Sequence, residues 1–130
     1  MNPASEDLKD FIELSSTGLD FTFGTNMFIG DMPDKPDNCI TLYDTGGPAP
    51  QANYDYYKPT VQILIRGDIQ GYQNAWDQAN SLSNALHGVA GETVNSTYYS
   101  QILASSDLMF VGKDDSNRPI FSINFEIHRY

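Results

Sequence analysis

The sequence predicts an α+β fold in which two helices pack on one face of a mixed, mainly antiparallel sheet of four to five strands. Three observations support this prediction. Two segments carry apolar residues at helical spacing, several others carry them at every second position, and hairpin-type turns separate several of the latter. The 130 residues have the usual length of one domain, so a single domain is expected over 1–130.

The first helix is expected close to the N-terminus. A short apolar stripe at helical spacing marks it, made of Leu8, Phe11 and Ile12. Asn2 or Ser5 can cap its start, because short polar side chains accept hydrogen bonds from the first backbone N–H groups of a helix. Gly18 is a natural stop, since glycine adopts the left-handed conformation that often ends helices.

The second helix is expected over 72–86. Its apolar stripe contains Tyr72, Ala75, Trp76, Ala79, Leu82 and Leu86, opposite a polar face. His87 falls in the last turn and Gly88 just beyond it, where the helix dipole and C-cap preferences place such residues. That position accounts for His87 without a chemical role.

Strand periodicity recurs along the rest of the chain. It is clearest in 59–66, where Val61, Ile63 and Ile65 face one way, and in 121–128. Further strands are expected at 19–23, 39–43 and 97–104, whereas 108–111 reads as a strand or an extended loop. The segments 31–38 and 44–58 are rich in turn-forming residues and are expected to be loops.

The charge balance argues against nucleic-acid binding. Seventeen acidic and seven basic residues give a formal net charge of −10, whereas Lys and Arg contacts with phosphate supply most of the affinity for DNA. A protein that lets DNA pass through a lumen without specific binding is compatible with this charge, because like charges repel. No stretch reaches the ~20 apolar residues of a membrane span, and the acidic segment 1–10 does not have the form of a secretory signal. We therefore expect no membrane contact and a protein that begins in a cytoplasm.

The sequence predicts no catalytic residue, no cofactor site and no metal site. Cys39 lies beside apolar residues and is expected to be a buried core thiol. His128 falls on the polar side of the last strand. Gly46 and Gly47 lack the lysine and the following helix of a phosphate-binding loop. Asp31, Asp34 and Asp37 do not have the spacing of a calcium loop, so a solvated acidic turn is the expected structure.

The loop over 44–58 is the first candidate for an assembly contact. It is longer than most connections in compact domains. It also carries Tyr54, Tyr56 and Tyr57, a residue type that is enriched at interfaces. A loop folded back on its own sheet is the alternative interpretation of this segment.

The turn over 114–118 is the second candidate. Arg66 and Arg118 are two of only three arginines in an acidic chain, and they could form ion pairs either between subunits or within one chain. The complete set of predicted interface residues is Asp44, Gly46, Gly47, Tyr54, Tyr56, Tyr57, Lys58, Arg66, Asp114, Asp115 and Arg118.

The order of several segments resembles a known family. TLYDTGG at 41–47 precedes a loop rich in Pro and Tyr, then PTVQILIRG at 59–67 and the helix at 72–86. Near the C-terminus, GKDDSNRP at 112–119 precedes FSINF at 121–125. This series, from residue 29 onward, resembles the tail terminator and minor capsid proteins of long-tailed bacteriophages.

The resemblance implies a structural virion protein of the tail–neck region, assembled in the bacterial host cytoplasm. Its copies would form a ring, of six subunits, that caps the tail-tube protein, ends tail polymerisation and meets the head-completion or connector protein. DNA would pass through the lumen without specific binding. No catalytic residue is implied, and the mechanism would be a head-to-tail interface that closes into a ring.

Two other functions remain open at this point. The chain could be a head-completion or stopper protein of the neck, which would change its partners but not its class. It could also be a small ligand-binding or hydrolase domain that uses the 44–58 loop as a lid. That last hypothesis predicts a concave pocket with strongly perturbed carboxylates.

Overall fold

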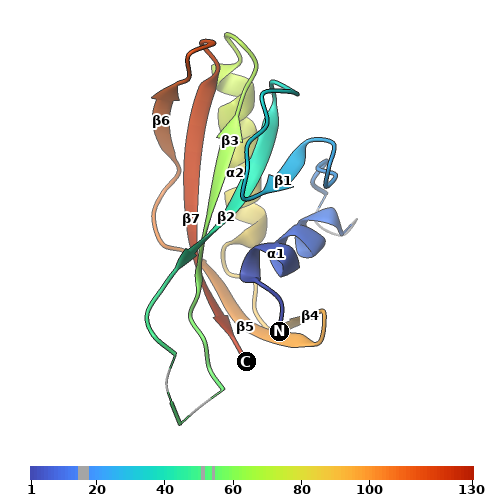
Figure 1. Cartoon of the computed structure of the whole chain (residues 1–130), viewed down its shortest axis with the longest axis vertical. Coiled ribbons are helices and arrows are strands. Elements are labelled where there is room, and N and C mark those ends of the chain that lie inside the picture. Colours follow the sequence, from blue (N-terminus) through green and yellow to red (C-terminus); the bar gives the residue numbers. More distant parts are fainter. Residues whose placement is uncertain (15–17, 51, 54) are drawn as a thin grey trace.

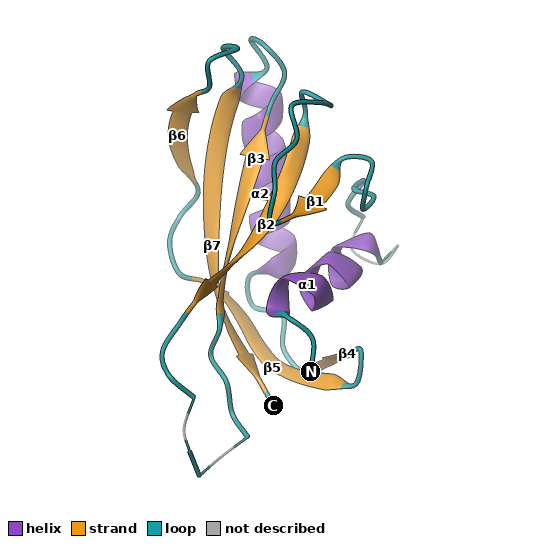
Figure 2. Cartoon of the chain, in the orientation of Figure 1, coloured by secondary structure: helices purple, strands orange, loops and turns teal. Residues whose placement is uncertain are grey.

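The computed structural model describes residues 1–14, 18–50, 52–53 and 55–130. Within these described residues, two helices and seven strands follow one another (Figures 1 and 2). In order, they are α1 (Ala4–Glu13), β1 (Met27–Ile29), β2 (Cys39–Gly46), β3 (Thr60–Arg66), α2 (Tyr72–Leu86), β4 (Glu92–Val94), β5 (Thr97–Ala104), β6 (Met109–Lys113) and β7 (Pro119–Arg129). The α+β fold predicted from the sequence is confirmed, with a larger sheet than expected.

All seven strands belong to one sheet, whose order is β1-β2-β3-β7-β5-β4, with β6 also paired to β7. The strands β1 and β2 run parallel, and the other strand pairs in the described part of the chain are antiparallel, so the sheet is mixed and mainly antiparallel. The long strand β7 organises it. One side of β7 pairs with β3, and the other side pairs with β6 along its first half and with β5 along its second half.

The register of the central strands gathers their apolar residues on one face. Ile63 of β3 lies opposite Ile123 of β7, and Ile65 lies opposite Phe121. Both helices cover this face, so that α1 contributes Leu8 and α2 contributes residues such as Leu82 to the same core cluster. The apolar side chains that recur at every second position in the strands, and about every 3.6 positions in the helices, therefore pack into one buried layer.

The two termini meet beneath α1. Arg129 at the end of β7 donates a hydrogen bond from Nη1 to the backbone oxygen of Asn2 at 2.7 Å. The Tyr99 hydroxyl donates to the carboxylate of Asp7, which also accepts a hydrogen bond from Asn95 at 2.8 Å. All three side chains of Asp7, Tyr99 and Arg129 are buried. Burial and the bond to Asp7 raise the pKa of Tyr99.

The expected strand over 19–23 is wrong. Phe23 makes only an isolated bridge to Met27, and residues 24–26 form a turn. The Asn26 side chain explains the change, because its Oδ1 accepts the backbone N–H of Thr22 at 2.7 Å and its Nδ2 donates to the carbonyl of Asp20 at 3.1 Å. Such side-chain bonds to the local backbone compete with strand pairing. The short strand β4 was not among the strands expected from the sequence.

The helices also differ in detail from the predictions. Helix α1 begins after Pro3 without a side-chain cap from Asn2 or Ser5 and ends at Glu13, before Gly18. Helix α2 has the predicted bounds, but Tyr72 and Trp76 are exposed. The buried stripe consists of Ala75, Ala79, Leu82 and Leu86. Small alanines at its centre fit a helix that packs closely on the sheet, with the two aromatic side chains left at its flank.

Candidate assembly surfaces

The described residues of the connection between β2 and β3, within 47–59, form an arm that extends beyond the end of the sheet (Figure 1). Gly47 has a φ of +117°, and a Cβ at this position would lie 2.6 Å from the carbonyl oxygen of Lys58. The two limbs of the arm therefore approach each other closely where only glycine fits. The described residues Pro48, Ala49, Pro50, Ala52, Asn53 and Asp55 are exposed.

The base of the arm is fixed to β7. Tyr57 and Arg129 exchange two backbone hydrogen bonds, of 2.8 and 3.0 Å, and Ile127 donates to the carbonyl of Pro59 at 2.9 Å. These bonds continue the β3–β7 ladder beyond Thr60, the first residue of β3, towards the arm. The arm thus starts from a rigid platform, and the described part of its tip stands clear of the sheet.

A group of tyrosines lies beside this base, and we call Tyr56, Tyr98 and Tyr130 the tyrosine cluster. The Tyr130 ring lies 5.0 Å from Tyr56 and 6.0 Å from Tyr98, centroid to centroid. The Tyr56 hydroxyl is hydrogen-bonded to Nδ1 of His128, whose Nε2 lies 3.1 Å from Glu126. Tyr98 and Tyr130 are about half exposed. An exposed group of tyrosines on a rigid base is a favourable binding surface.

The structure brings some of the interface residues predicted in the 44–58 loop together and places others outside the arm. Tyr56, Tyr57 and Lys58 form the base, with the Lys58 ammonium 5.5 Å from the centre of the Tyr56 ring. Asp44 instead faces α1 and binds Ser5. Gly46 takes part in a β-bulge at the end of β2, and Tyr54 lies outside the described residues. Tyr98 and Tyr130 were not among the predicted interface residues. The period of two in strand β5 could have indicated Tyr98, because its neighbour Tyr99 is buried and Tyr98 must then face the other side.

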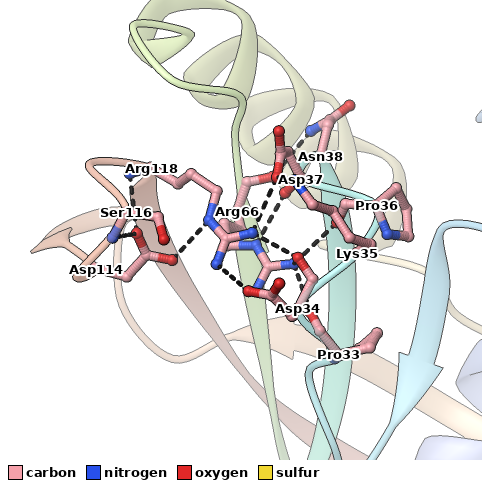
Figure 3. Close-up of polar contacts among 10 residues, drawn as sticks. All are labelled: Pro33, Asp34, Lys35, Pro36, Asp37, Asn38, Arg66, Asp114, Ser116 and Arg118. Carbon is pink, nitrogen blue, oxygen red and sulfur yellow. Dashed lines mark hydrogen bonds and ion pairs between the residues drawn. The ribbon is translucent and has the colours of Figure 1, made fainter.

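Arg66 and Arg118 form a buried arginine cluster at the opposite end of the sheet (Figure 3). The Arg66 guanidinium holds the 33–38 loop by its backbone: Nη2 donates to the carbonyls of Pro33 at 2.5 Å and Pro36 at 2.8 Å, and Nε donates to Asp37 at 2.9 Å. Asp31 and Asp34 are exposed, as expected of a solvated acidic turn, but the backbone of the turn has a further role that the sequence did not predict. The carbonyl oxygens of this turn surround an arginine.

Arg118 adds three carboxylates to the same cluster. Its guanidinium lies 3.0 Å from Asp34, 3.0 Å from Asp37 and 2.8 Å from Asp114. The pKa of Arg118 is raised, because hydrogen bonds to these carboxylates outweigh the desolvation that would lower it. Both arginine side chains thus make their contacts within the chain, which is the second of the two arrangements considered from the sequence, namely pairs between subunits or within one chain. Asp115 is exposed in the adjoining turn.

The remaining candidates for chemistry have structural environments. Cys39 is buried, and burial raises the pKa of its thiol. The Nδ1 atom of His87 accepts the backbone N–H of Ala104 at 2.9 Å. No helix in the described residues has the length and apolar character needed to cross a membrane.

The cavities near the arm lack the chemistry that the lid hypothesis predicts. One, of about 90 Å³, is lined by Pro48, Ala49, Tyr56 and Lys58. A larger one, of about 310 Å³, lies between 46–50, 57–59 and Arg129. Neither has a carboxylate among its described lining residues. The pKa values of Asp37 and Asp114 are shifted, but they lie in the distant arginine cluster and are lowered.

The sequence model of the bacteriophage tail terminator proteins matches residues 14–130, which is nearly the whole chain. No individual curated protein matches the sequence. The extent of the family match decides the assignment, and the chain belongs to the bacteriophage tail terminator family, a family of structural virion proteins.

Proposed function

We propose that copies of this chain form a ring, of six subunits, that caps the tail tube, ends tail polymerisation and joins the tail to the head connector. Family membership supports the part of this proposal that concerns the end of tail polymerisation. The ring, its copy number and its connector contact are inferences from the resemblance and from the shape of the subunit. A head-to-tail contact that closes on itself would stop growth without any chemical step.

The arm is the observation on which the proposal mainly rests. Its base is held by backbone hydrogen bonds to β7, and its described tip residues are exposed. An ordered base with a projecting tip can reach a neighbouring protein at little cost in conformational entropy, because the base is already fixed. The tyrosine cluster lies next to it and extends the same surface.

The subunit has two structurally different ends. The arm and the tyrosine cluster lie at one end, and the arginine cluster with the turn before β7 lies at the other (Figures 1 and 3). A protein that joins two different assemblies needs two such surfaces. We propose that one end contacts the tail-tube protein and the other contacts the head-completion or connector protein. The net charge of −10 suits a lumen through which DNA slides without binding.

Removal of the arm tip tests the proposal. Residues 49–55 are replaced by two glycines, and the variant is mixed with polymerising tail-tube protein. We expect far-UV circular dichroism and thermal unfolding close to those of the wild type, but tubes of uncontrolled length in electron micrographs. The control is the exposed substitution Asp115→Ala at the other end of the molecule.

The result separates the alternatives. Normal tube lengths with the shortened arm would show that the arm is not the tube-capping element. Pull-down experiments against tube protein and against connector protein then distinguish a terminator from a stopper. A chain that binds only the connector protein would contradict the terminator assignment of the arm and support the stopper hypothesis.

A further inference from the structure

We propose that the outer edge of β6, with the exposed side chains beside it, is the surface on which a second copy of this chain docks by adding a strand to the sheet. This inference rests on the proposed function, because it assigns the contact between neighbouring subunits of the ring. It adds a lateral surface to the two ends described above.

The first observation is an unpaired sheet edge. Strands β5 and β6 lie one after the other along the same side of β7. The outer edge of β5 is covered, since β4 pairs with its beginning. Farther along β5, the backbone N–H of Ile102 donates to the carbonyl of Val89, and the carbonyl of Ile102 accepts the backbone N–H of Gly88. Within the described part of the chain, β6 pairs only with β7. Its outer N–H and C=O groups therefore form a template for another strand.

The second observation is a group of exposed apolar side chains that flank this edge on both faces of the sheet, since Met109 pairs with Ser122 and Phe110 pairs with the core residue Phe121. Met109, Phe110 and Val111 of β6 are 58%, 42% and 56% exposed. Tyr72 and Trp76 of α2 are 46% and 36% exposed, and the Tyr72 ring lies 5.1 Å from that of Phe110. We call these five residues the edge patch. Three consecutive exposed apolar residues on an open strand are unusual in a monomer, because such edges aggregate.

Natural sheets protect open edges with charge, proline or a covering segment. The β6 sequence, MFVGK, contains no proline, and Lys113 at its end is its only charged residue. The bulge between Phe110 and Gly112 bends the strand but leaves the apolar side chains exposed. The chain is rich in acidic residues, yet none of them lies on this open apolar strand. This indicates that assembly covers the edge.

The size of the edge patch fits a protein partner. Aromatic side chains present about 150–250 Å² each, so the exposed fractions amount to about 400 Å². A specific interface buries at least about 1,000 Å² in total, or about half of that on each partner. The patch with the strand edge therefore supplies most of one side of such an interface.

Charge and direction favour a second copy as the partner. Two chains of net charge −10 repel each other over most of their surfaces, whereas Met109, Phe110, Val111 and Gly112 carry no charge and Lys113 is basic. In Figure 1, β6 runs along the long axis at the side of the sheet, away from the arm. Subunits placed side by side would cover this edge, and proteins bound at the two ends would not.

Photo-cross-linking identifies the partner directly. A photoreactive amino acid replaces Val111, and the variant is mixed with isotope-labelled wild-type chain on capped tail tubes. We expect cross-linked peptides that join a light and a heavy copy. The control carries the same photoreactive amino acid in place of the exposed Asn74, on α2, and should give at least tenfold fewer such peptides.

A paired substitution provides the second measurement. Met109→Lys with Val111→Lys places two charges on the edge, and Asn74→Lys with Asn84→Lys adds the same charge to exposed positions of α2. The β6 pair should keep the wild-type circular dichroism and reduce light–heavy cross-linking at least tenfold, and the α2 pair should not. Because the β6 pair lacks Val111, this comparison uses a photoreactive group at position 76. It replaces Trp76 in the β6 pair, in the α2 pair and in a reference chain with no other substitution.

The outcomes are distinguishable. If the wild type does not cap tubes, the proposed function fails. If it caps tubes but the probe at position 111 links to tube or connector protein, or to no protein, this inference fails and the proposed function stands. Unchanged cross-linking in the folded β6 pair would also overturn it.

Discussion

The carboxylate of Asp44 on β2 caps helix α1 from a position 39 residues away in the chain: Ser5 donates its backbone N–H to Oδ1 at 3.1 Å and its hydroxyl to Oδ2 at 2.6 Å. The first backbone N–H groups of a helix have no partner within it, and a carboxylate there also interacts favourably with the dipole. The structure assigns this task to a strand, because Pro3 at the N-cap has no side-chain acceptor.

Removal of this carboxylate should weaken the attachment of α1. We expect Asp44→Ala to lower the free energy of unfolding by about 1 kcal/mol, as the loss of an N-cap does. Urea denaturation followed by circular dichroism measures the change. Asp55→Ala removes an equal charge from the exposed arm and should change stability by less than about 0.5 kcal/mol. Equal losses in both variants would show that charge, and not capping, is responsible.

The 33–38 loop should depend on Arg66 more than on any exposed ion pair. Arg66→Lys replaces a planar fork of donors by a single ammonium group, which cannot reach the four carbonyls of this loop together. Partly buried carbonyls then lose their donors, and the several lost bonds together should cost about 3 kcal/mol in the free energy of unfolding. Hydrogen exchange and urea unfolding measure the effect. Lys35→Ala, at a side chain that is 73% exposed, is the control and should be nearly neutral.

Much of the fold was predictable because periodicity and burial agree. Helix α2 and strand β5 have the predicted bounds, and the alternation in β3 and β7 gave the correct buried face. The failures have local causes. In 19–23 the pattern was that of a strand, but the Asn26 side chain folds the backbone into a turn. Tyr72 and Trp76 fit the helical stripe by spacing, yet they lie at the edge of the contact with the sheet.

The candidate surfaces were less predictable, because they depend on contacts between distant segments. The sequence indicated the 44–58 loop and its tyrosines, but the partners Tyr98 and Tyr130 come from β5 and from the C-terminus. Arg66 and Arg118 stood out by their rarity. No local pattern could show that residues 33–38 fold over both and bury them.

The arginine cluster should make the protein acid-sensitive. Hydrogen bonds from Lys35 and then from Arg118 lower the pKa of Asp37 below its ordinary value of 3.8. For Asp114, burial alone would raise the pKa, but hydrogen bonds from Arg118 and Ser116 outweigh it, and the pKa is lowered. A carboxyl with a lower pKa in the folded state stabilises the fold above its unfolded pKa, and the contribution is lost as pH falls through the folded value.

Stability should therefore be level above about pH 4 and fall below it. Urea midpoints between about pH 2 and 6 measure this dependence. Asp114→Asn should be less stable than the wild type near neutral pH and should lose less stability on acidification. Asp115→Asn, at the exposed neighbour, should follow the wild-type curve. An unchanged acid dependence in Asp114→Asn would contradict the role assigned to this carboxylate.

The buried hydroxyl of Tyr99 should stabilise α1 in a way that its neighbour in sequence does not. Tyr99 donates to Asp7, a carboxylate that is buried and otherwise accepts hydrogen bonds from the amides of Asn95 and Asn2. Tyr99→Phe removes only the hydroxyl, so the ring packing stays and the buried carboxylate loses one donor. We expect a loss of about 2 kcal/mol in the free energy of unfolding.

Tyr98→Phe is the matched control, because that ring points to the exposed side of β5 and the substitution should change the free energy of unfolding by less than about 0.5 kcal/mol. Urea unfolding compares the two, and hydrogen exchange of α1 should accelerate only in Tyr99→Phe. Faster exchange in both variants would mean that the general packing of β5, and not the bond to Asp7, holds the helix in place.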